Sequence, residues 1–358
     1  MKLLTRGLAL AILALPVLPR APAQAQDAFE KVSVPYYGVL SFPRGVRSIG
    51  MGMAGVADAA DAANVFYNPA VAAGRPGMTV TGGYNTWKED FRIVDVGATA
   101  TYRPASERLR NWRIGGGIRY TELSYAPVND DHARPLVPGF LGPVSLSFTD
   151  WYIAPTVAAA YTFHRVDVAA GFAVKRLEAG IADDNRFVNW SYDAGLLVKR
   201  GFCTSGGRMV TPSFGVSALS FGADTEHGAG IIDPVSQMRY GLGIRLEEMG
   251  VQQSGMAVRC TGPVLAIALD AEILDYNDPQ APERKLGSGV GVEFSLADIL
   301  SVRYGYADGQ EFFDFGQTFG GSLGYGWGRT SVHFEYAAAF GDGHDSISVI
   351  GFTVGMDL

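Results

Sequence analysis

The chain has 358 residues, with 29 Lys and Arg against 36 Asp and Glu and a formal net charge of −7. This acidic balance argues against a nucleic-acid partner, which would need a basic stripe. The length fits two or three soluble domains or one large β-barrel, and 46 glycines with 20 Phe and 16 Tyr favour the barrel. After the N-terminus no apolar 20-residue run predicts a transmembrane helix, but transmembrane strands hide their hydrophobicity in alternation.

The first residues predict an export signal. Lys2 and Arg6 are basic, residues 8–18 are apolar, and residues 23–25 (AQA) give the small-x-small pattern of a cleavage site. The apolar run is too short to cross a bilayer. Residues 1–25 are therefore expected to be a signal peptide, which places the rest of the chain outside the cytoplasm.

The stretch GMGMAG, residues 50–55, matches the G-x-G-x-x-G pattern of a dinucleotide-binding turn. Such a turn needs an apolar strand before it, a helix after it and an acidic residue about twenty positions on. No apolar strand precedes this stretch, and position 70 is an alanine. We therefore expect no cofactor and assign residues 26–76 to a small plug, whose glycines let the backbone pack closely against a barrel wall.

From residue 77 onward the sequence alternates between apolar and polar residues. Val332, Phe334 and Tyr336 fall on one face of a strand, with His333 and Glu335 on the other. About fourteen strands are predicted, an even number as in bacterial outer-membrane barrels. They cover roughly 77–87, 91–104, 112–125, 147–164, 166–181, 186–202, 208–222, 236–250, 256–277, 283–299, 300–310, 313–327, 330–340 and 347–358.

The connections between these strands alternate between long acidic loops and short turns. Residues 127–144 and 222–235 are long, whereas 164–165 and 296–298 are short. Short periplasmic turns and longer external loops are typical of transmembrane barrels. The sequence thus predicts an all-β protein of the outer membrane, a ~14-stranded antiparallel transmembrane barrel over residues 77–358 with an N-terminal plug.

The plug sequence RSIGMGMAGVADAADAANVFYNPAVAA, residues 47–73, resembles the N-terminal signature of the PorV/PorQ family within the FadL-type outer-membrane proteins. Val71 replaces the usual glycine, and one of the paired aspartates is displaced to Asp58. The closing strands resemble the family through Asp270, Glu272, Glu293, Arg303, Gly305, Tyr306, Tyr336, Gly341, Asp342, His344 and Ser348. The plug motif comprises Arg47, Gly50, Gly52, Gly55, Asp61, Asn68, Pro69 and Ala70.

The resemblance implies a fourteen-stranded barrel with a plug, no covalent chemistry, and a role in protein export or surface attachment of the type IX kind. In that role the barrel would bind secretion-system proteins or secreted cargo. An alternative is a FadL-like channel that takes up hydrophobic small molecules, with residues 135–144 (PLVPGFLGPV) as an apolar loop over a pocket. A remote alternative is a hydrolase centred on Ser322 in GGSLG, with Asp342 and His344, although that motif requires a strand-turn-helix context.

Seven charged residues are expected to line a polar lumen, where they pair across it, hold the plug or line a route for a solute. They are Arg113, Arg119, Lys175, Arg239, Arg245, Arg303 and Glu335. The five histidines show no metal-ligand spacing, so no metal site is expected. Cys203 and Cys260, the only cysteines, could form a disulfide in an oxidising compartment if the turns that carry them fold inward.

Overall fold

The computed structural model describes residues 38–357 except 41, 59–60, 75, 88–90, 126–147, 182–184, 204–207, 223–224, 228–229, 233–235, 255–256, 278–284, 310–314 and 342–345. The chain divides into two units, Met1–Pro35 and Tyr36–Leu358, and all described residues belong to the second. The predicted signal peptide and residues 26–37 of the predicted plug lie outside them.

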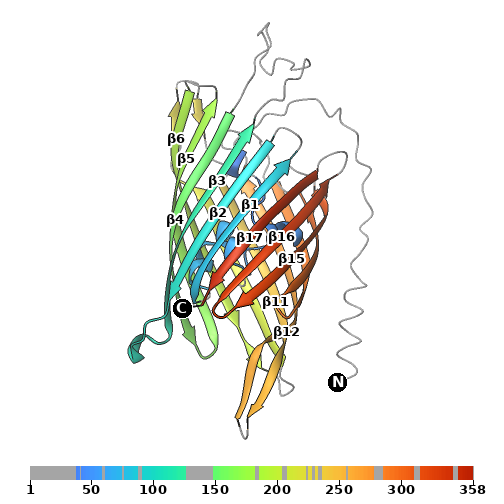
Figure 1. Cartoon of the computed structure of the whole chain (residues 1–358). Coiled ribbons are helices and arrows are strands. Elements are labelled where there is room, and N and C mark those ends of the chain that lie inside the picture. The colour runs from blue at the N-terminus through green and yellow to red at the C-terminus, as the bar shows by residue number, and fades with distance from the viewer. Residues whose placement is uncertain are drawn as a thin grey trace. The chain divides into compact units, whose positions relative to one another are not determined.

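The second unit is a closed antiparallel β-barrel of 14 long strands (Figure 1). Each strand pairs with its neighbours in the barrel, and the last pairs with the first, Met78 lying opposite Met356. The strands are β1 (Gly77–Trp87), β2 (Phe91–Tyr102), β3 (Trp112–Tyr125), β4 (Phe148–Phe163), β5 (Val166–Ile181), β6 (Asn185–Arg200), β8 (Arg208–Phe221), β11 (Ser236–Ser254), β12 (Ala257–Asn277), β13 (Lys285–Leu296), β14 (Leu300–Asp308), β15 (Phe315–Trp327), β16 (Thr330–Gly341) and β17 (Ser346–Met356).

Three short strands and one short 3-10 turn accompany the 14 long strands. β7 (Phe202–Cys203) pairs with β8, and β9 (Thr225–His227) pairs with β10 (Gly230–Ile232) in a separate hairpin. A 3-10 turn, η4 (Glu107–Leu109), lies between β2 and β3. The predicted fold class is confirmed, and most strand bounds agree with the expected ones within two residues.

The connection between β11 and β12 differs from its prediction. The two strands were expected to end at residue 250 and to begin again at residue 256, but β11 and β12 stay paired as far as Ser254 and Ala257. The neighbouring ladders end earlier, at Glu248 for β8–β11 and at Leu265 for β12–β13. Two register shifts, around Met249, accompany this extension, so the hairpin continues as a two-stranded ribbon where the barrel wall ends.

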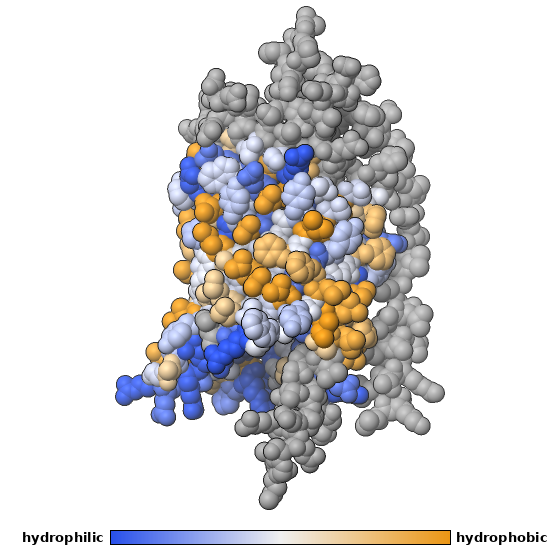
Figure 2. Space-filling view, in the orientation of Figure 1, coloured by the Kyte–Doolittle hydropathy of each residue, from blue (hydrophilic) through white to orange (hydrophobic). Residues whose placement is uncertain are grey.

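The two faces of the wall differ as the alternation predicts. Along β14, Leu300, Val302 and Tyr304 are exposed on the outside, whereas Ser301 and Arg303 are buried inside. Figure 2 shows apolar residues gathered across the middle of the described surface on one side of the molecule. An outer apolar band around a polar interior is the arrangement that a lipid bilayer requires of a barrel. Among the described residues no helix is long and apolar enough to cross a membrane.

Inside the barrel lies the described part of the plug, four short helical turns coloured blue in Figure 1. They are η1 (Gly38–Leu40), α2 (Val46–Gly50), η2 (Ala62–Phe66) and η3 (Pro69–Ala73). The Asp61 side chain caps η2 by accepting from the Ala63 N–H at 2.9 Å, and Asn68 caps η3 through the Ala70 N–H at 3.0 Å. Turns this short are not stable alone, so the plug depends on the wall around it.

A charged substitution on the outer face tests the membrane assignment. Leu242, in the middle of β11, is 64% exposed on the outside. In a bilayer, Leu242→Arg should destabilise the folded barrel by about 2–4 kcal/mol, whereas Leu242→Ala should have a much smaller effect. The measurement is the folded fraction in lipid vesicles across a urea series, scored by heat-modifiable gel mobility. Equal stability of the two variants would contradict a lipid-facing position.

Candidate functional site: the plugged lumen

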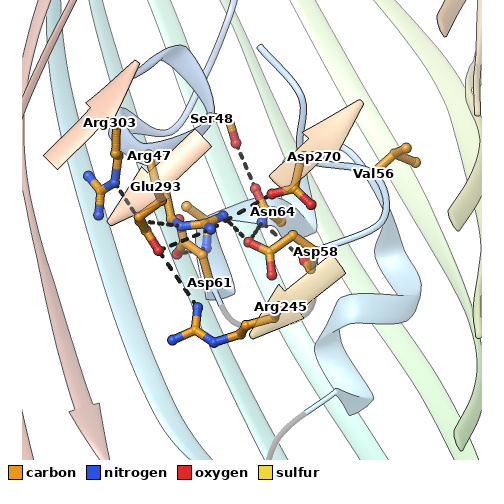
Figure 3. Close-up of polar contacts among 12 residues, drawn as sticks. Arg47, Ser48, Val56, Asp58, Asp61, Asn64, Arg245, Asp270, Glu293 and Arg303 are labelled. Atoms are coloured by element: carbon orange, nitrogen blue, oxygen red, sulfur yellow. Dashed lines mark hydrogen bonds and ion pairs between the residues drawn. The ribbon is translucent and has the colours of Figure 1, made fainter. Parts of the chain in front are cut away.

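Arg47 of α2 is the centre of the polar contacts between plug and wall (Figure 3). Its Nε lies 2.9 Å from Oε2 of Glu293 on β13, and its Nη2 lies 3.2 Å from Oε1 of the same carboxylate. Its Nη1 pairs with Asp58 of the plug, and Asp270 on β12 is 3.8 Å from Nη2. Burial opposes the charge, but Glu293 and Asp270 raise the pKa of Arg47 above its ordinary value. The guanidinium therefore stays charged and joins the plug to two adjacent strands.

The same carboxylate extends the network around the wall. Arg303 on β14 donates from Nε to Glu293 at 2.7 Å and from Nη1 to Glu335 on β16 at 2.9 Å. Arg245 on β11 lies 3.6 Å from Glu293 and donates to Glu247 at 2.8 Å. Charges on five strands, β11, β12, β13, β14 and β16, thus meet around one plug arginine, and each arginine is matched by a carboxylate, as buried charges require.

A second acidic group of the plug lies beside this network. Burial, together with nearby Glu335, raises the pKa of Asp61 to about 6, although Arg47 and the Ala63 N–H oppose the shift. Next to it, Asn64 accepts from the Ser48 hydroxyl at 2.6 Å and donates to the Asp58 carbonyl at 3.0 Å. These contacts hold residues 51–58 against α2 and η2, so this part of the plug presents a fixed surface to the wall.

Glu272 of β12 holds the following turn of the plug. Its Oε2 accepts from the N–H groups of Gly55 and Val56, at 2.8 and 3.0 Å, and its Oε1 pairs with Arg239 on β11. The Arg239 guanidinium in turn lies 4.5 Å from the centroid of the Tyr67 ring, a cation–π distance. A wall carboxylate therefore satisfies backbone donors of the plug that would otherwise be buried without partners.

The Asn-Pro-Ala segment, residues 68–70, makes the contact with the opposite side of the barrel. Asn68 Nδ2 donates to the Val56 carbonyl at 2.9 Å and to the Leu196 carbonyl of β6 at 3.0 Å. Here the wall residues are glycines, because a Cβ at Gly195 would lie 2.0 Å from Asn68 Oδ1 and one at Gly171 would lie 2.4 Å from Pro69. Any side chain would push the plug off the wall at this point.

Wall glycines of this kind surround the plug. A Cβ built at Gly305 or Gly289 would lie 2.2 or 2.1 Å from the backbone of Gly52, which itself has φ +67°. Others face plug residues on the remaining sides, namely Gly115, Gly215, Gly241, Gly291 and Gly320. Sequence reasoning missed these wall glycines, although their inward positions within alternating strands were a usable signal.

The predicted lumen residues of the β3–β6 wall also face inward and contact the plug or its surroundings. Arg119 donates to the Val65 carbonyl at 3.0 Å and to Asp193 at 2.7 Å, and Lys175 lies 2.9 Å from Asp193. Arg113 donates to the Ala73 carbonyl at 3.1 Å. Asp193 was not singled out from the sequence, yet it neutralises two of the predicted cations.

The cysteines and Ser322 lie in surroundings that differ from the sequence-based expectations. The disulfide is not formed: Cys203 is a free, exposed thiol on β7, while Cys260 lies on β12 with β8 and β11 between them. Three strand spacings of about 4.8 Å exceed the reach of a disulfide.

Ser322 lies in β15, where it accepts a hydrogen bond from Arg303 at 3.3 Å, so it has no nucleophile elbow. Asp342, His344 and the loop 135–144 lie outside the described residues.

The lumen is apolar toward the end that carries the long loops. Ile93, Leu123 and Leu177 face inward there and are completely buried. They belong to one cluster with Val39 and Leu40 of η1. A wall of this composition is unlike the polar interior of a water-filled channel.

No protein-family model matches the sequence, and no curated protein matches it. Solved structures are similar in fold at low identity. The toluene transporter TbuX of Ralstonia pickettii is 12% identical with a TM-score of 0.53, over 89% of this chain and 98% of that one. The CymD monoaromatic hydrocarbon channel is 13% identical with a TM-score of 0.53, over 88% and 97%.

These similarities concern the fold alone, since a shared fold does not imply a shared function. The chain therefore has the fold of FadL-type outer-membrane barrels, closed by an N-terminal plug.

Breaking the Arg47 network should loosen the plug. Arg47→Met leaves Glu293 and Asp58 buried without their main cation and should cost about 3–5 kcal/mol of stability. Glu293→Gln should cost less in the Arg47→Met background than in the wild type, because the contacts of Glu293 with Arg47 are already gone and only those with Arg303 and Arg245 remain. Urea titrations of the two single variants and the double variant measure this coupling. Additive effects would show that the two groups do not act as a pair.

The close approach of plug and wall can be tested at Gly171. Gly171→Ala should destabilise the folded protein by about 1–3 kcal/mol, because the new methyl group meets the backbone of Pro69. The control is Gly116→Ala on β3, where the nearest atom lies 3.7 Å away, and which should be neutral or slightly stabilising. Thermal unfolding followed by gel mobility compares the two. A neutral Gly171→Ala would mean that the plug does not rest on this wall.

Proposed function

We propose that the chain is an outer-membrane channel for small hydrophobic molecules. The observation that carries the proposal is the apolar lining of the lumen at its long-loop end. Ile93, Leu123 and Leu177 turn inward from the wall and are covered by apolar side chains of the plug. Such a lining would be unfavourable in an aqueous pore, but it suits a solute that leaves water on entry.

The contacts of the plug indicate which part of it would move when a solute passes. α2, η2 and η3 are tied to the wall by ion pairs and hydrogen bonds, through Arg47, Glu272 and Asn68 among others. η1, by contrast, meets the wall through the apolar side chains of Val39 and Leu40. An apolar solute can replace these apolar contacts. The one charged group bonded to η1 is Arg44, whose Nη2 donates to the Val39 carbonyl at 2.6 Å, and it would need another acceptor if η1 moved.

The similarity in fold to TbuX and CymD supports the same proposal. One is described as a toluene transporter and the other as a monoaromatic hydrocarbon channel. The matches cover 89% and 88% of this chain. Fold-level analogy raises the expectation of a related solute class here, while the site itself supplies the chemical reason.

A second candidate is the PorV/PorQ-type role in protein export, in which the barrel binds secretion-system or cargo proteins. It is supported by the plug signature that contains Arg47, Asn68 and Pro69. In the structure these residues pack and pair inside the barrel. They therefore suit any plugged barrel and favour neither role. A non-enzymatic function fits both candidates, since Ser322 is buried and bonded to Arg303.

The test is entry of the hydrophobic dye N-phenyl-1-naphthylamine into vesicles with a lipopolysaccharide outer leaflet. Vesicles that contain the protein should admit the dye faster than protein-free vesicles. Leu177→Ser should slow entry by roughly threefold to tenfold, the factor that about 1 kcal/mol of lost apolar contact gives. Val168→Ser, on the outer face of the same strand, is the matched control and should have little effect.

Equal entry with and without the protein would contradict the channel proposal. If the purified barrel also retained a secreted protein partner, the export role would then be favoured.

A further inference from the structure

A row of polar side chains crosses the inner wall at the height of the apolar lining. Asp95 on β2 is paired in register with Thr121 on β3, and Thr121 with Tyr152 on β4. The row continues through Leu177 on β5 to Asn189 on β6. Residues in register on neighbouring strands have Cβ atoms about 5 Å apart, so these five side chains form one continuous strip.

The polar members of the strip hold hydrogen-bonding atoms without partners. Within the described part of the chain, no protein group bonds Asp95 Oδ2, Thr121 Oγ1, Tyr152 OH or Asn189 Nδ2. The same is true of Ser191 Oγ, one inward position along β6. Each of these side chains is at least 95% buried. Folded proteins leave few buried polar atoms unpaired, so a cluster on four strands, β2, β3, β4 and β6, indicates a surface made to pair with something that enters the lumen.

The charges around the strip decide what kind of group it suits. Lys175 is already bonded to Asp193 at 2.9 Å and to the Ser220 hydroxyl at 2.8 Å, and Arg119 is bonded to Asp193 at 2.7 Å. The groups left over are hydroxyls, an amide N–H and the carboxylate oxygen of Asp95. Together they donate and accept. Two cations lie over the Tyr152 ring, Arg44 at 5.1 Å and Lys175 at 5.3 Å from its centroid, so the negative charge of Asp95 is balanced within the site. This set matches a neutral hydroxyl, which both donates and accepts.

The rest of the surroundings is apolar. Leu177 lies within the strip, while Ile93 and Leu123 lie one inward position nearer the long-loop end. η1 lies against β3 and β4, and its Val39 and Leu40 belong to the same apolar cluster. A molecule with an apolar body and one hydroxyl would bury the body among these side chains and pair its polar end with the strip.

We propose that the polar side chains of the strip, Asp95, Thr121, Tyr152 and Asn189, form a binding site together with the neighbouring Ser191. The site takes an apolar molecule that carries a neutral hydroxyl, of the phenol class. The hydroxyl pairs with Tyr152 and its neighbours, and the apolar body takes the place of Val39 and Leu40 of η1. The inference rests on the proposed channel function and deepens it, because it separates phenols from both bare hydrocarbons and carboxylates.

The experiment is equilibrium dialysis of the full-length folded protein in detergent with three radiolabelled probes that share a methyl-substituted benzene ring. They are toluene, p-cresol, which adds a hydroxyl, and p-toluate, which carries a carboxylate. The wild type should bind p-cresol about tenfold more tightly than toluene, as one good hydrogen bond allows, and p-toluate most weakly.

Two variants separate the site from general effects. Tyr152→Phe removes an unpaired hydroxyl without changing the ring, so it should reduce the preference for p-cresol to about twofold or less and leave toluene binding unchanged. Tyr192→Phe, on the lipid-facing side of β6, should keep the full preference. Heat-modifiable gel mobility confirms that both variants are folded before they are compared.

Each outcome bears on one proposal or the other. If toluene and p-cresol bind equally to the wild type, the strip is satisfied by water and the inference is wrong, while the channel proposal stands. Tightest binding of p-toluate would also overturn it, since the site would then favour an anion over a neutral hydroxyl. If none of the three probes binds, the channel proposal itself fails. A p-cresol preference that survives Tyr152→Phe and Asn189→Leu would place the site elsewhere.

Discussion

The structure depends on one constraint, that the buried ion pairs around Arg47 stay complete. The barrel turns Glu293, Asp270 and Arg303 toward a lumen from which the plug excludes water, and charges in such a place need partners. Arg47 supplies the central one, with two contacts to Glu293 and one to Asp58. The network therefore holds the plug in one orientation.

Wall glycines provide the space in which this network can form. With Cβ atoms at Gly171 and Gly195 on one side and at Gly289 and Gly305 on the other, the plug backbone could not approach the wall. The close fit also restricts where motion can occur. α2, η2 and η3 are held by polar bonds, whereas η1 is held by apolar contacts over the β3 and β4 wall. A route for an apolar solute is thus most easily opened beneath η1, next to the strip that contains Tyr152.

Much of this architecture follows from the sequence, and the parts that do not have physical reasons. Period-two alternation placed the long strands, because inward and outward side chains meet different solvents. It also placed Arg113, Arg119 and Arg303 on the lumen side. Alternation cannot show which inward residues meet the plug, so Asp193 and the wall glycines were missed. It cannot show unpaired groups either, since the strip through Tyr152 arises from the register of separate strands. The extension of the β11–β12 ribbon to Ser254 and Ala257 was missed, because alternation within one strand does not show how far two strands stay paired.

The most direct test of the account is native-state hydrogen exchange of the plug amides in the folded, full-length protein. The N–H groups of Ile49, Met53 and Tyr67 bond to plug carbonyls at 3.1, 2.7 and 2.9 Å and are buried in the lumen. A plug fixed by the Arg47 network predicts that these amides exchange as slowly as those of the adjacent strands β13 and β14, while η1 exchanges faster. Exchange of Ile49 and Met53 at the rate of an unfolded peptide, with the strands still protected, would contradict a fixed plug.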